Sequence, residues 1–378
     1  MKSHLTDSIS LLTNGKEAFP EILKCIENAK ESIEINMFIW RADNIGKTIA
    51  KAVFNAAERG VKVYISVDRY GFVLEKCEEC SHSFFHKKPT FSESVKINTL
   101  KFLYPTLLNR NPPEENHGLL LEKILNHPNI VISKDVFKAD HSKYYIIDEK
   151  ILIMGGINIE DKENGCDIRG IEYQDYMIKF DGKEHVENFR NKMNNNINSS
   201  NEYRFAVNNK SVLPHIFEIE DHFLEIINSS QIELVIVMAY FSPVKKFTEA
   251  IISAKNRGVK VSIMIPEHAN FQDDLNKKTV KKLMKATNNG INVFLSPKMA
   301  HTKLIFNEKT VSLGSANITK KAFNQLSELN FTIERTDSQF CNNLNEKAWG
   351  YINESRKISN YKEIKYNRIY AFVEGFVV

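Results

Sequence analysis

The chain has 378 residues, of which 42% are hydrophobic and 26% charged, a composition typical of a soluble globular protein rather than a disordered, collagenous or coiled-coil chain. At roughly 150 residues per domain, this length favours two domains or one duplicated domain. The 51 basic and 47 acidic residues give a net charge of +4, which permits nucleic acid or an anionic membrane as partner without indicating either.

Targeting and redox signals are weak. The longest near-continuous apolar stretch, 234–241, is far shorter than the roughly 20 residues of a membrane-spanning helix, and residues 1–4 lack the apolar region of a signal peptide. Five cysteines are few and odd in number, which disfavours a disulfide scaffold. We therefore expect a cytoplasmic protein.

An internal repeat organises the chain. Each half is predicted to contain a strand, then a helix, then a second strand, at 32–40, 45–59 and from Val61, and again at 231–241, 244–257 and from Val259. Both helices end in Arg-Gly-Val-Lys-Val, where Gly60 and Gly258 supply left-handed C-caps. Two β-α-β units with right-handed crossovers predict an α/β fold with a mainly parallel sheet flanked by helices.

A polar stretch at 191–201, rich in Asn and Ser, is expected to join the two halves. It predicts a first repeat at 1–195 and a second at 202–378. The first half is longer than the second between its Arg-Gly and its His-x-Lys sequence, which indicates an insertion at about 70–120.

The repeat is sharpest at two predicted hairpins that begin with His-x-Lys. Residues two apart share one face of a strand, so His141 should project beside Lys143, and His301 beside Lys303. Brought together across a pseudo-two-fold axis, the four side chains predict one phosphodiester-processing site at the interface of the halves. The lysines would bind phosphate oxygens, while one imidazole attacks phosphorus and the other protonates the leaving alcohol, with no metal or other cofactor.

Neutral side chains follow both motifs. Asn158, Ser315 and Asn317 are expected to donate hydrogen bonds to the same phosphate oxygens. A single His-x-Lys is usually incidental and asparagine is often only a turn residue. Two motifs in register within matched folds are poorly explained by chance.

The motifs resemble those of the phospholipase D superfamily, in which His-x-Lys is followed by four residues, Asp, six residues, Gly-Gly or Gly-Ser, and Asn. The first copy fits fully, with Asp148. The second is one residue shorter, and we align Asn307 rather than Glu308 with Asp148, placing the missing residue in the preceding strand. The resemblance implies a duplicated phospholipase D-like domain with one interfacial active site, in which this Asp is mainly structural.

Within that superfamily, segments 11–19, 33–40, 155–159 and 173–176 look like the bacterial cardiolipin synthases without membrane spans. This implies transfer of a phosphatidyl group from one phosphatidylglycerol to another through a phosphohistidine. It also implies anionic phospholipid at a membrane surface as partner, met peripherally at the inner face of the cell membrane. We take His141, in the intact motif, as the nucleophile.

The resemblance further implies that one carboxylate in each half orients the histidine of the opposite motif. Glu328 is the candidate in the second half, and Glu172 or Asp175 in the first. The residues alone favour a different interpretation, in which each of these acids is a solvated surface charge.

Two alternatives stay open. Segments 314–321 and 326–330 resemble the small nucleases of the superfamily at least as much, and the Arg-Ser that synthases carry after the Asn is absent. A phospholipase D-type hydrolase or a metal-independent nuclease is therefore one alternative, although the modest net charge does not favour nucleic acid. The other is an inactive protein that binds lipid or nucleic acid, supported only by the altered second motif.

The insertion contains Cys77, Cys80, His82 and His86, whose Cys-x-x-Cys spacing is used by zinc knuckles. So short a loop leaves little chain to wrap a tetrahedral ion, so ordinary loop residues are the favoured interpretation. The insertion is also unusually apolar, and it either caps the site and touches acyl chains or packs on the domain. Its large apolar residues include Phe84, Phe85, Phe91, Phe102, Leu103, Tyr104, Leu107 and Leu108.

Two features close the chain. Residues 369–378 are apolar and predict a final sheet strand rather than a membrane anchor. Lysines at helical spacing predict a basic face that meets anionic phosphates or only solvent. They are Lys277, Lys278, Lys281, Lys282 and Lys285.

Overall fold

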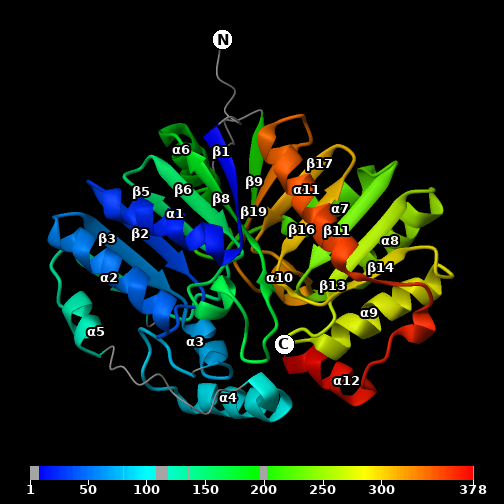
Figure 1. Ribbon diagram of the computed structural model, residues 1–378, viewed down its shortest axis with the longest axis horizontal. Coiled ribbons are helices and arrows are strands. Elements are labelled where there is room, and N and C mark those ends of the chain that lie inside the picture. Colours follow the sequence, from blue (N-terminus) through cyan, green and yellow to red (C-terminus); the bar gives the residue numbers. More distant parts are fainter. Residues whose placement is uncertain (1–7, 80, 108–117, 135, 196–201, 378) are drawn as a thin grey trace. The chain divides into compact units, whose positions relative to one another are not determined.

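The computed structural model describes residues 8–79, 81–107, 118–134, 136–195 and 202–377. The chain forms two compact units, a first unit of Ser8–Asn194 and a second unit from Asn195 onward (Figure 1). Most of the expected linker, 196–201, lies outside the described residues.

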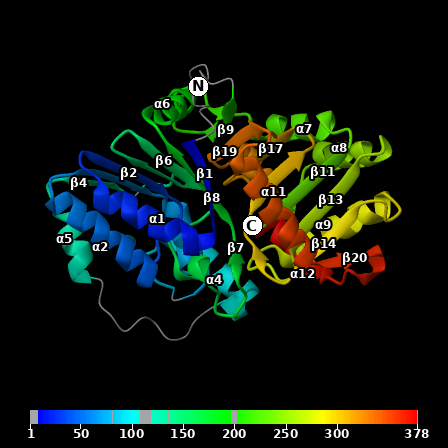
Figure 2. The same ribbon diagram turned by 45° about the horizontal axis from the view of Figure 1, so that its top comes forward.

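The first unit is built on a seven-stranded sheet in the order β1-β8-β6-β5-β2-β3-β4. The strands of this sheet are β1 (Ile9–Thr13), β2 (Ser32–Met37), β3 (Lys62–Val67), β4 (Ile130–Ser133), β5 (Tyr144–Ile147), β6 (Ile151–Gly155) and β8 (Tyr176–Asp181). The short β7 (Tyr173–Gln174) lies outside it. The helices of the unit are α1 (Asn14–Asn28), α2 (Asn44–Glu58), α3 (Arg69–Glu75), α4 (Phe91–Leu103), α5 (Gly118–Leu125) and α6 (Lys183–Met193). The helices α1 and α2 lie side by side (Figures 1 and 2). Their apolar faces pack against the sheet and form the core with it.

The second unit repeats this plan on a nine-stranded sheet, β10-β9-β19-β17-β16-β11-β13-β14-β20. Its strands are β9 (Tyr203–Asn209), β10 (Ile216–Phe217), β11 (Glu233–Met238), β13 (Lys260–Pro266), β14 (Asn292–Ser296), β16 (Lys303–Asn307), β17 (Thr310–Gly314), β19 (Glu328–Glu334) and β20 (Arg356–Ile358), with the short β12 (Phe241–Ser242), β15 (Met299–Ala300) and β18 (Ile318–Thr319). Its helices are α7 (Ile219–Ser229), α8 (Lys245–Asn256), α9 (Asp273–Ala286), α10 (Lys320–Asn324), α11 (Gln339–Glu354) and α12 (Arg368–Val377). The strands from β9 to β14 follow the order of the first sheet, which confirms the duplicated α/β fold.

Both sheets are mixed, whereas we expected a mainly parallel one. The predicted β-α-β units do give parallel pairs, β2 with β3 and β11 with β13. The hairpins β5–β6 and β16–β17 pair antiparallel, as do their neighbours toward β1 and β9. In the two hairpins the physical reason is connection length, because a short turn can return the chain only in the antiparallel direction.

The repeated Arg-Gly sequence ends α2 and α8 as predicted. Gly60 and Gly258 have φ angles of +97° and +94°, which a residue with a Cβ adopts only under strain. The preceding Arg59 and Arg257 reach back to the carbonyl groups at the ends of α1 and α7. The motif therefore ends one helix and joins it to the one beside it.

The predicted C-terminal strand is wrong, because Arg368–Val377 forms the helix α12. Asn367 begins it by accepting hydrogen bonds at Oδ1 from the N–H groups of Ile369 and Tyr370. The place beside β14 is taken instead by β20. A short apolar run does not by itself distinguish a strand from a helix.

The strand register also corrects the alignment of the two motifs. Ile147 pairs with Ile33 on β2, and Asn307 pairs with Leu234 on β11, so Asn307 corresponds to Ile147. Glu308 is then the counterpart of Asp148. The missing residue lies in the hairpin turn, where a deletion leaves both strand registers unchanged, and not in the preceding strand.

Hydrogen bonding supports this register. Asp148 accepts from the N–H groups of Lys30, Glu31 and Ser32 at 2.7–3.1 Å. Glu308 accepts from those of Gln231, Ile232 and Glu233 at 3.1–3.3 Å. Burial acts to raise the pKa of each carboxyl, but the backbone N–H groups outweigh it and leave both pKa values below normal.

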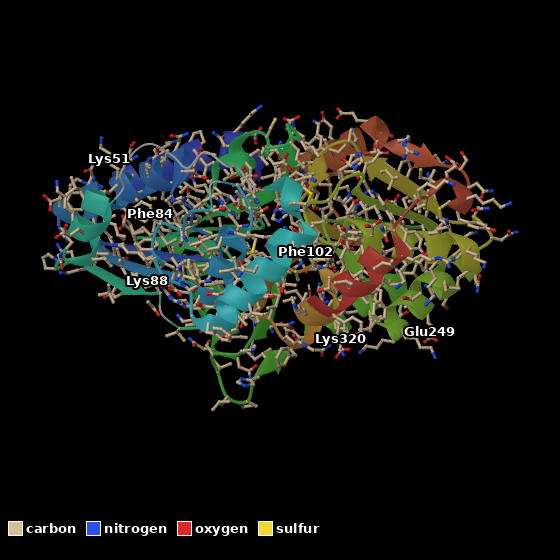
Figure 3. All side chains as sticks on the ribbon, turned by 90° about the horizontal axis from the view of Figure 1, so that it is seen from below. Lys51, Phe84, Lys88, Phe102, Glu249 and Lys320 are labelled. Carbon is tan, nitrogen blue, oxygen red and sulfur yellow. The ribbon has the colours of Figure 1, made fainter. Side chains whose placement is uncertain are left out.

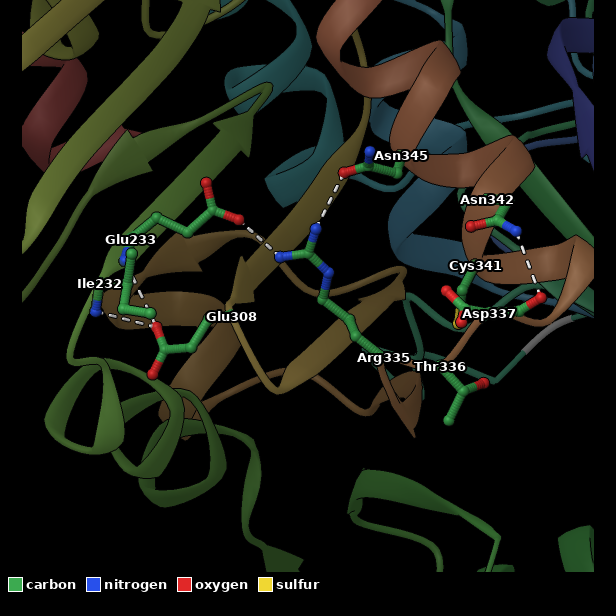
Figure 4. Close-up of a pocket in the computed structure, with 9 residues that line it drawn as sticks. All are labelled: Ile232, Glu233, Glu308, Arg335, Thr336, Asp337, Cys341, Asn342 and Asn345. Atoms are coloured by element: carbon green, nitrogen blue, oxygen red, sulfur yellow. Dashed lines mark hydrogen bonds and ion pairs between the residues drawn. The ribbon is translucent and has the colours of Figure 1, made fainter.

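Figure 4 shows the surroundings of Glu308, a surface depression at the turn end of the β16–β17 hairpin. Beside it, Arg335 Nη1 lies 2.6 Å from Glu233 Oε1, and Arg335 Nη2 donates to Asn345 Oδ1 at 3.0 Å. The lining contains neither His301 nor Lys303. Its polar groups bind one another, which indicates an anchor for the hairpin rather than a ligand site.

We predict that Asp148→Asn and Glu308→Gln each lower the free energy of unfolding at pH 7 by about 1–2 kcal/mol, because a neutral amide accepts backbone hydrogen bonds less strongly. A carboxyl with a depressed folded-state pKa stabilises above its unfolded pKa of about 4 and loses that contribution as pH falls through the folded value. Urea unfolding against pH should therefore show the gap to wild type closing below about pH 4.

Glu149→Gln is the matched control, because this exposed carboxylate in the same turn pairs with Arg190 at the surface. Its effect should stay below about 1 kcal/mol. A gap for Asp148→Asn that persists unchanged at about pH 3 would contradict the role assigned to the carboxylate.

Candidate active site

The His-x-Lys residues lie at the entrances of β5 and β16 rather than along them. His141 and Lys143 precede β5, and Lys303 is the first residue of β16. All four motif side chains are buried. Each lysine Nζ donates to the carbonyl oxygen of its own histidine, at 2.5 Å for Lys143 and in the same pairing for Lys303 with His301. The pairs are close because the lysine folds back on the motif, not because of strand alternation.

An aromatic ring supports the first pair. The Phe38 ring meets His141 edge-on, with centroids 4.6 Å apart. Lys143 Nζ lies 5.0 Å from the centroid of the same ring. The π face of Phe38 stabilises a buried ammonium, and its edge limits how the imidazole can turn.

A polar framework holds the segment before β5, and the sequence analysis missed it. Asp140 accepts from the backbone and hydroxyl of Ser142, and Asn36 donates to both residues. Asp68 accepts from the N–H of Asp140 at 2.5 Å. Burial raises the pKa of Asp140 and raises that of Asp68 to about 6. The only sequence signal was an Asp directly before His141.

The second pair lacks this framework, because Ala300 stands where the first unit has Asp140. There the N–H of Ala239 donates to the carbonyl of Thr302 at 3.1 Å. The Tyr240 ring lies near that of His301, with centroids 6.3 Å apart. The two half-sites thus share the His-Lys geometry but not its support.

The register decides which acid of the first unit corresponds to Glu328. Gly155 pairs with Met177 on β8, and Gly314 pairs with Asn330 on β19. Two residues earlier in the chain are Asp175, directly before β8, and Glu328, the first residue of β19. Glu172, by contrast, is a surface side chain 38% exposed and 3.9 Å from Lys16.

Asp175 and Glu328 are both buried, so the surface-charge interpretation is wrong for these two acids. In the first unit, a Cβ added at Gly156 would overlap the Asp175 carboxylate. In the second, Ser315 Oγ donates to Glu328 Oε2 at 2.5 Å and accepts from the N–H of Leu329 at 2.9 Å. The pair of Gly156 and Asp175 in the first unit therefore occupies the same place in the fold as the pair of Ser315 and Glu328 in the second.

The two asparagines are anchored differently. Asn158 Nδ2 lies 3.4 Å from Glu160 Oε1, and its Oδ1 is buried without a partner among the residues that the structure describes. Asn317 Oδ1 accepts from the N–H of Tyr240 at 3.2 Å. The Asn158 amide is therefore held at Nδ2, whereas its buried Oδ1 is an unsatisfied acceptor.

A buried ionic cluster, also missed, lies behind Asn158. Arg41 Nε is 3.0 Å from Glu160 Oε2, and Lys162 Nζ is 2.5 Å from Glu78 Oε1 and 3.4 Å from Glu160 Oε2. Burial lowers the pKa of Lys162, but Glu160 and Glu78 raise it more, so the lysine stays charged. The cluster fixes the Glu160 carboxylate that holds Asn158. Its members are too far apart in sequence to form a recognisable motif.

Three of the four zinc-knuckle residues, Cys77, His82 and His86, lie in the described part of the chain and form no metal-ligand cluster there. Cys77 Sγ donates to the carbonyl of Val73 at 2.9 Å, and burial raises the pKa of its thiol to about 12. His86 Nε2 lies 2.6 Å from the carbonyl of Lys134. Cys80 is outside the described residues.

The apolar residues of the insertion divide into two groups. Phe84 and Phe85 are buried and contact the Trp40 ring, so they belong to the core. Phe91 and Phe102, on α4, are 88% and 80% exposed (Figure 3 labels Phe84 and Phe102). The remaining members divide likewise, with Tyr104 and Leu107 buried, Leu103 half-buried and Leu108 outside the described residues.

Residues 22–197 and 223–350 match the family described as cardiolipin synthase, PLD-like domain. The chain is 27% identical to cardiolipin synthase B of Shigella flexneri over 277 residues, which cover 68% of this chain and 60% of that protein. It is 24% identical to cardiolipin synthase of Clostridium perfringens strain SM101 over 354 residues, 86% of this chain and 67% of that one. The chain thus spans about 60% of the length of the first of these curated relatives.

Among solved structures, phosphatidylserine synthase of Haemophilus influenzae superposes with a TM-score of 0.68 over 98% of this chain and 91% of that one. Sequence identity is 13%, so the likeness concerns the fold. A search of the described residues finds no helix with both the length and the apolar character needed to cross a membrane.

We predict that Gly156→Ala destabilises the protein by about 1–3 kcal/mol, because the new methyl group must displace the buried Asp175 carboxylate. Gly350→Ala is the control, since an added Cβ on α11 meets no atom within 4 Å, and it should stabilise by up to about 1 kcal/mol. Urea unfolding of both variants measures the difference. Equal stability of Gly156→Ala and wild type would show that Asp175 is free to move.

Proposed function

Because this chain belongs to the family described as cardiolipin synthase, PLD-like domain, we propose that it transfers a phosphatidyl group between phospholipids. The superfamily indicated by the motifs is confirmed by the same match. The observation that carries the proposal is the buried His-Lys pair at one and the same place in both copies of the fold.

The proposed reaction has two steps at phosphorus. An imidazole nitrogen of His141 attacks the phosphorus of phosphatidylglycerol, the bond from phosphorus to the glycerol headgroup breaks, and His301 gives its proton to the leaving oxygen. In the second step His301 removes the proton from a hydroxyl group of another phosphatidylglycerol. That oxygen attacks the phosphohistidine, so cardiolipin forms and His141 is released.

The lysines supply the charge. Lys143 and Lys303 would neutralise the phosphate oxygens as negative charge develops there, a role that their buried position strengthens. Asn158 would add a neutral donor with the second hydrogen of Nδ2, because the first faces Glu160 and Oδ1 can only accept. Ser315 is better assigned to holding Glu328, because its hydroxyl proton is already engaged by that carboxylate.

We assign the nucleophile to His141 on structural support. Its segment is fixed by Asp140 and Asn36, and its ring is packed against Phe38. A nucleophile held in one orientation loses less entropy on attack. The acids Asp175 and Glu328 would each fix the tautomer of a catalytic histidine, as the motif resemblance implies.

The partner in this proposal is anionic phospholipid, met at the surface of the membrane that contains it, on its cytoplasmic face. Water in place of the second lipid would release phosphatidic acid from the same intermediate. The acceptor therefore decides between a transferase and a phospholipase D-type hydrolase, and the two differ in product rather than in the first step.

We predict that wild-type protein converts phosphatidylglycerol in EDTA to cardiolipin and glycerol, whereas His141→Ala and His301→Ala lower turnover by at least about a thousandfold, since each removes one partner of the transfer. Mass spectrometry of the lipids from detergent-mixed micelles measures the products.

Glu149→Gln serves as the matched control, because this carboxylate is exposed and lies in the hairpin turn, at the opposite end of β5 from His141. It should keep wild-type turnover. Phosphatidic acid as the main product would replace transfer by hydrolysis. Untouched lipid together with metal-independent cleavage of nucleic acid would contradict the lipid assignment.

A further inference from the structure

The helix α12 turns its apolar side chains away from the protein. Ile369, Phe372 and Phe376 are 75%, 62% and 75% exposed. Spaced three and four residues apart, they form one stripe along the helix, and the Phe372 and Phe376 rings contact each other with centroids 4.9 Å apart. A surface helix normally turns such a stripe toward the core, so its exposure here indicates an interaction surface.

The opposite face of α12 is held by polar contacts. The helix lies alongside α9 in both views (Figures 1 and 2). The buried Glu374 carboxylate accepts a hydrogen bond of 2.8 Å from the N–H of Leu275 in the first turn of α9. Asn367, which begins α12, donates its N–H to Asp274 Oδ1 at 2.7 Å, and Ala371 is buried on the same side. The acid thus faces the protein and the apolar stripe faces outward.

Cations outnumber acids on α9 and in the segment that leads into α12. Glu363, the acid just before α12, accepts at one oxygen from the N–H groups of Ser359 and Asn360. Exposed cations lie on the approach to α12, at its first residue and on the neighbouring α9. They are Lys278, Lys282, Lys362, Lys365 and Arg368.

We propose that α12 docks the second unit on the surface of a bilayer that contains anionic phospholipid. Ile369, Phe372 and Phe376 would enter the boundary between headgroups and acyl chains, while the surrounding cations bind lipid phosphates. A helix of 10 residues is about 15 Å long, too short to cross a bilayer, so it would lie in the plane of the interface.

The charge pattern favours this occupant. The exposed stripe of α12 is apolar, the one acid of the helix is buried, and lysine and arginine lie on the neighbouring segments. This pattern complements a bilayer whose headgroups are negative and whose acyl chains are apolar. This inference rests on the proposed function, since docking would bring the site to lipid that stays in its bilayer. Binding to vesicles and turnover are nevertheless separate measurements.

The test compares full-length proteins that all carry His141→Ala, so that no lipid is consumed. Sedimentation with vesicles of phosphatidylcholine, with and without phosphatidylglycerol, measures binding. We expect binding that requires phosphatidylglycerol, weakens with salt, and falls at least about tenfold in the triple variant Ile369→Asn/Phe372→Asn/Phe376→Asn.

Leu119→Asn/Leu213→Asn is the matched control, because these leucines are 71% and 85% exposed but lie outside α12. It should bind like its parent. A second measurement leaves the stripe apolar. Compared with its parent, Phe372→Trp should add tryptophan emission that shifts to shorter wavelength on the vesicles and is quenched by brominated acyl chains.

Unchanged binding of the triple variant, or added emission in Phe372→Trp that vesicles do not alter, would overturn the proposal. So would a wild-type dimer that the triple variant converts to a monomer without any effect of vesicles, because a second copy would then cover the stripe. Wild type that makes product in mixed micelles but ignores vesicles would remove the docking surface and leave the proposed function. Wild type that binds vesicles but makes no product would remove the proposed function and leave the docking surface.

Discussion

The carboxylate that joins each motif hairpin to the start of the neighbouring strand, β2 or β11, is the contact on which the two half-sites depend. Asp148 gathers the N–H groups at the start of β2, and Glu308 does the same at β11. A slip of one residue in a strand would send every side chain to the opposite face. By fixing the hairpin turn, the carboxylate fixes the register that places His141 and His301 at the strand entrances.

This tie also explains why Glu308 replaces Asp in the shorter copy. The turn after β16 is one residue shorter, and Glu308 there accepts from three backbone N–H groups as Asp148 does, but with a longer side chain. Alignment of residues 307–309 with residues 148–150 by identity obscures the match of Glu308 with Asp148, because it ignores the position of each residue relative to its strand. The hydrogen bonds of Asn307 go elsewhere, to the end of α7 and to its own turn.

What the sequence predicted well was set by local chemistry and by duplication. The glycines after α2 and α8, the β-α-β units and the paired hairpins follow from residue spacing alone. Residue spacing does not encode contacts between distant segments. The mixed pairing of the strands, the burial of Asp175 and the ionic cluster around Lys162 depend on such contacts. The C-terminal apolar run was wrongly predicted as a strand. It forms the helix α12, whose large apolar side chains cover no core.

The two half-sites are alike in their His-Lys pairs and differ in the residues that hold those pairs. The first has Phe38 and the Asp140 framework, and the second has the Ser315–Glu328 pair. Such asymmetry suits two histidines with different tasks, one held rigidly to attack phosphorus and one free to give and take a proton. In the proposed reaction, this division of tasks places the covalent intermediate on the first unit.

The most direct measurement is headgroup exchange, in which phosphatidylglycerol is incubated with isotopically labelled glycerol and the lipid is assayed for label. A phosphohistidine that forms and reverses predicts labelled phosphatidylglycerol with wild type and none with His141→Ala. Cardiolipin production without any incorporation of glycerol would show direct transfer between lipids and contradict the covalent mechanism.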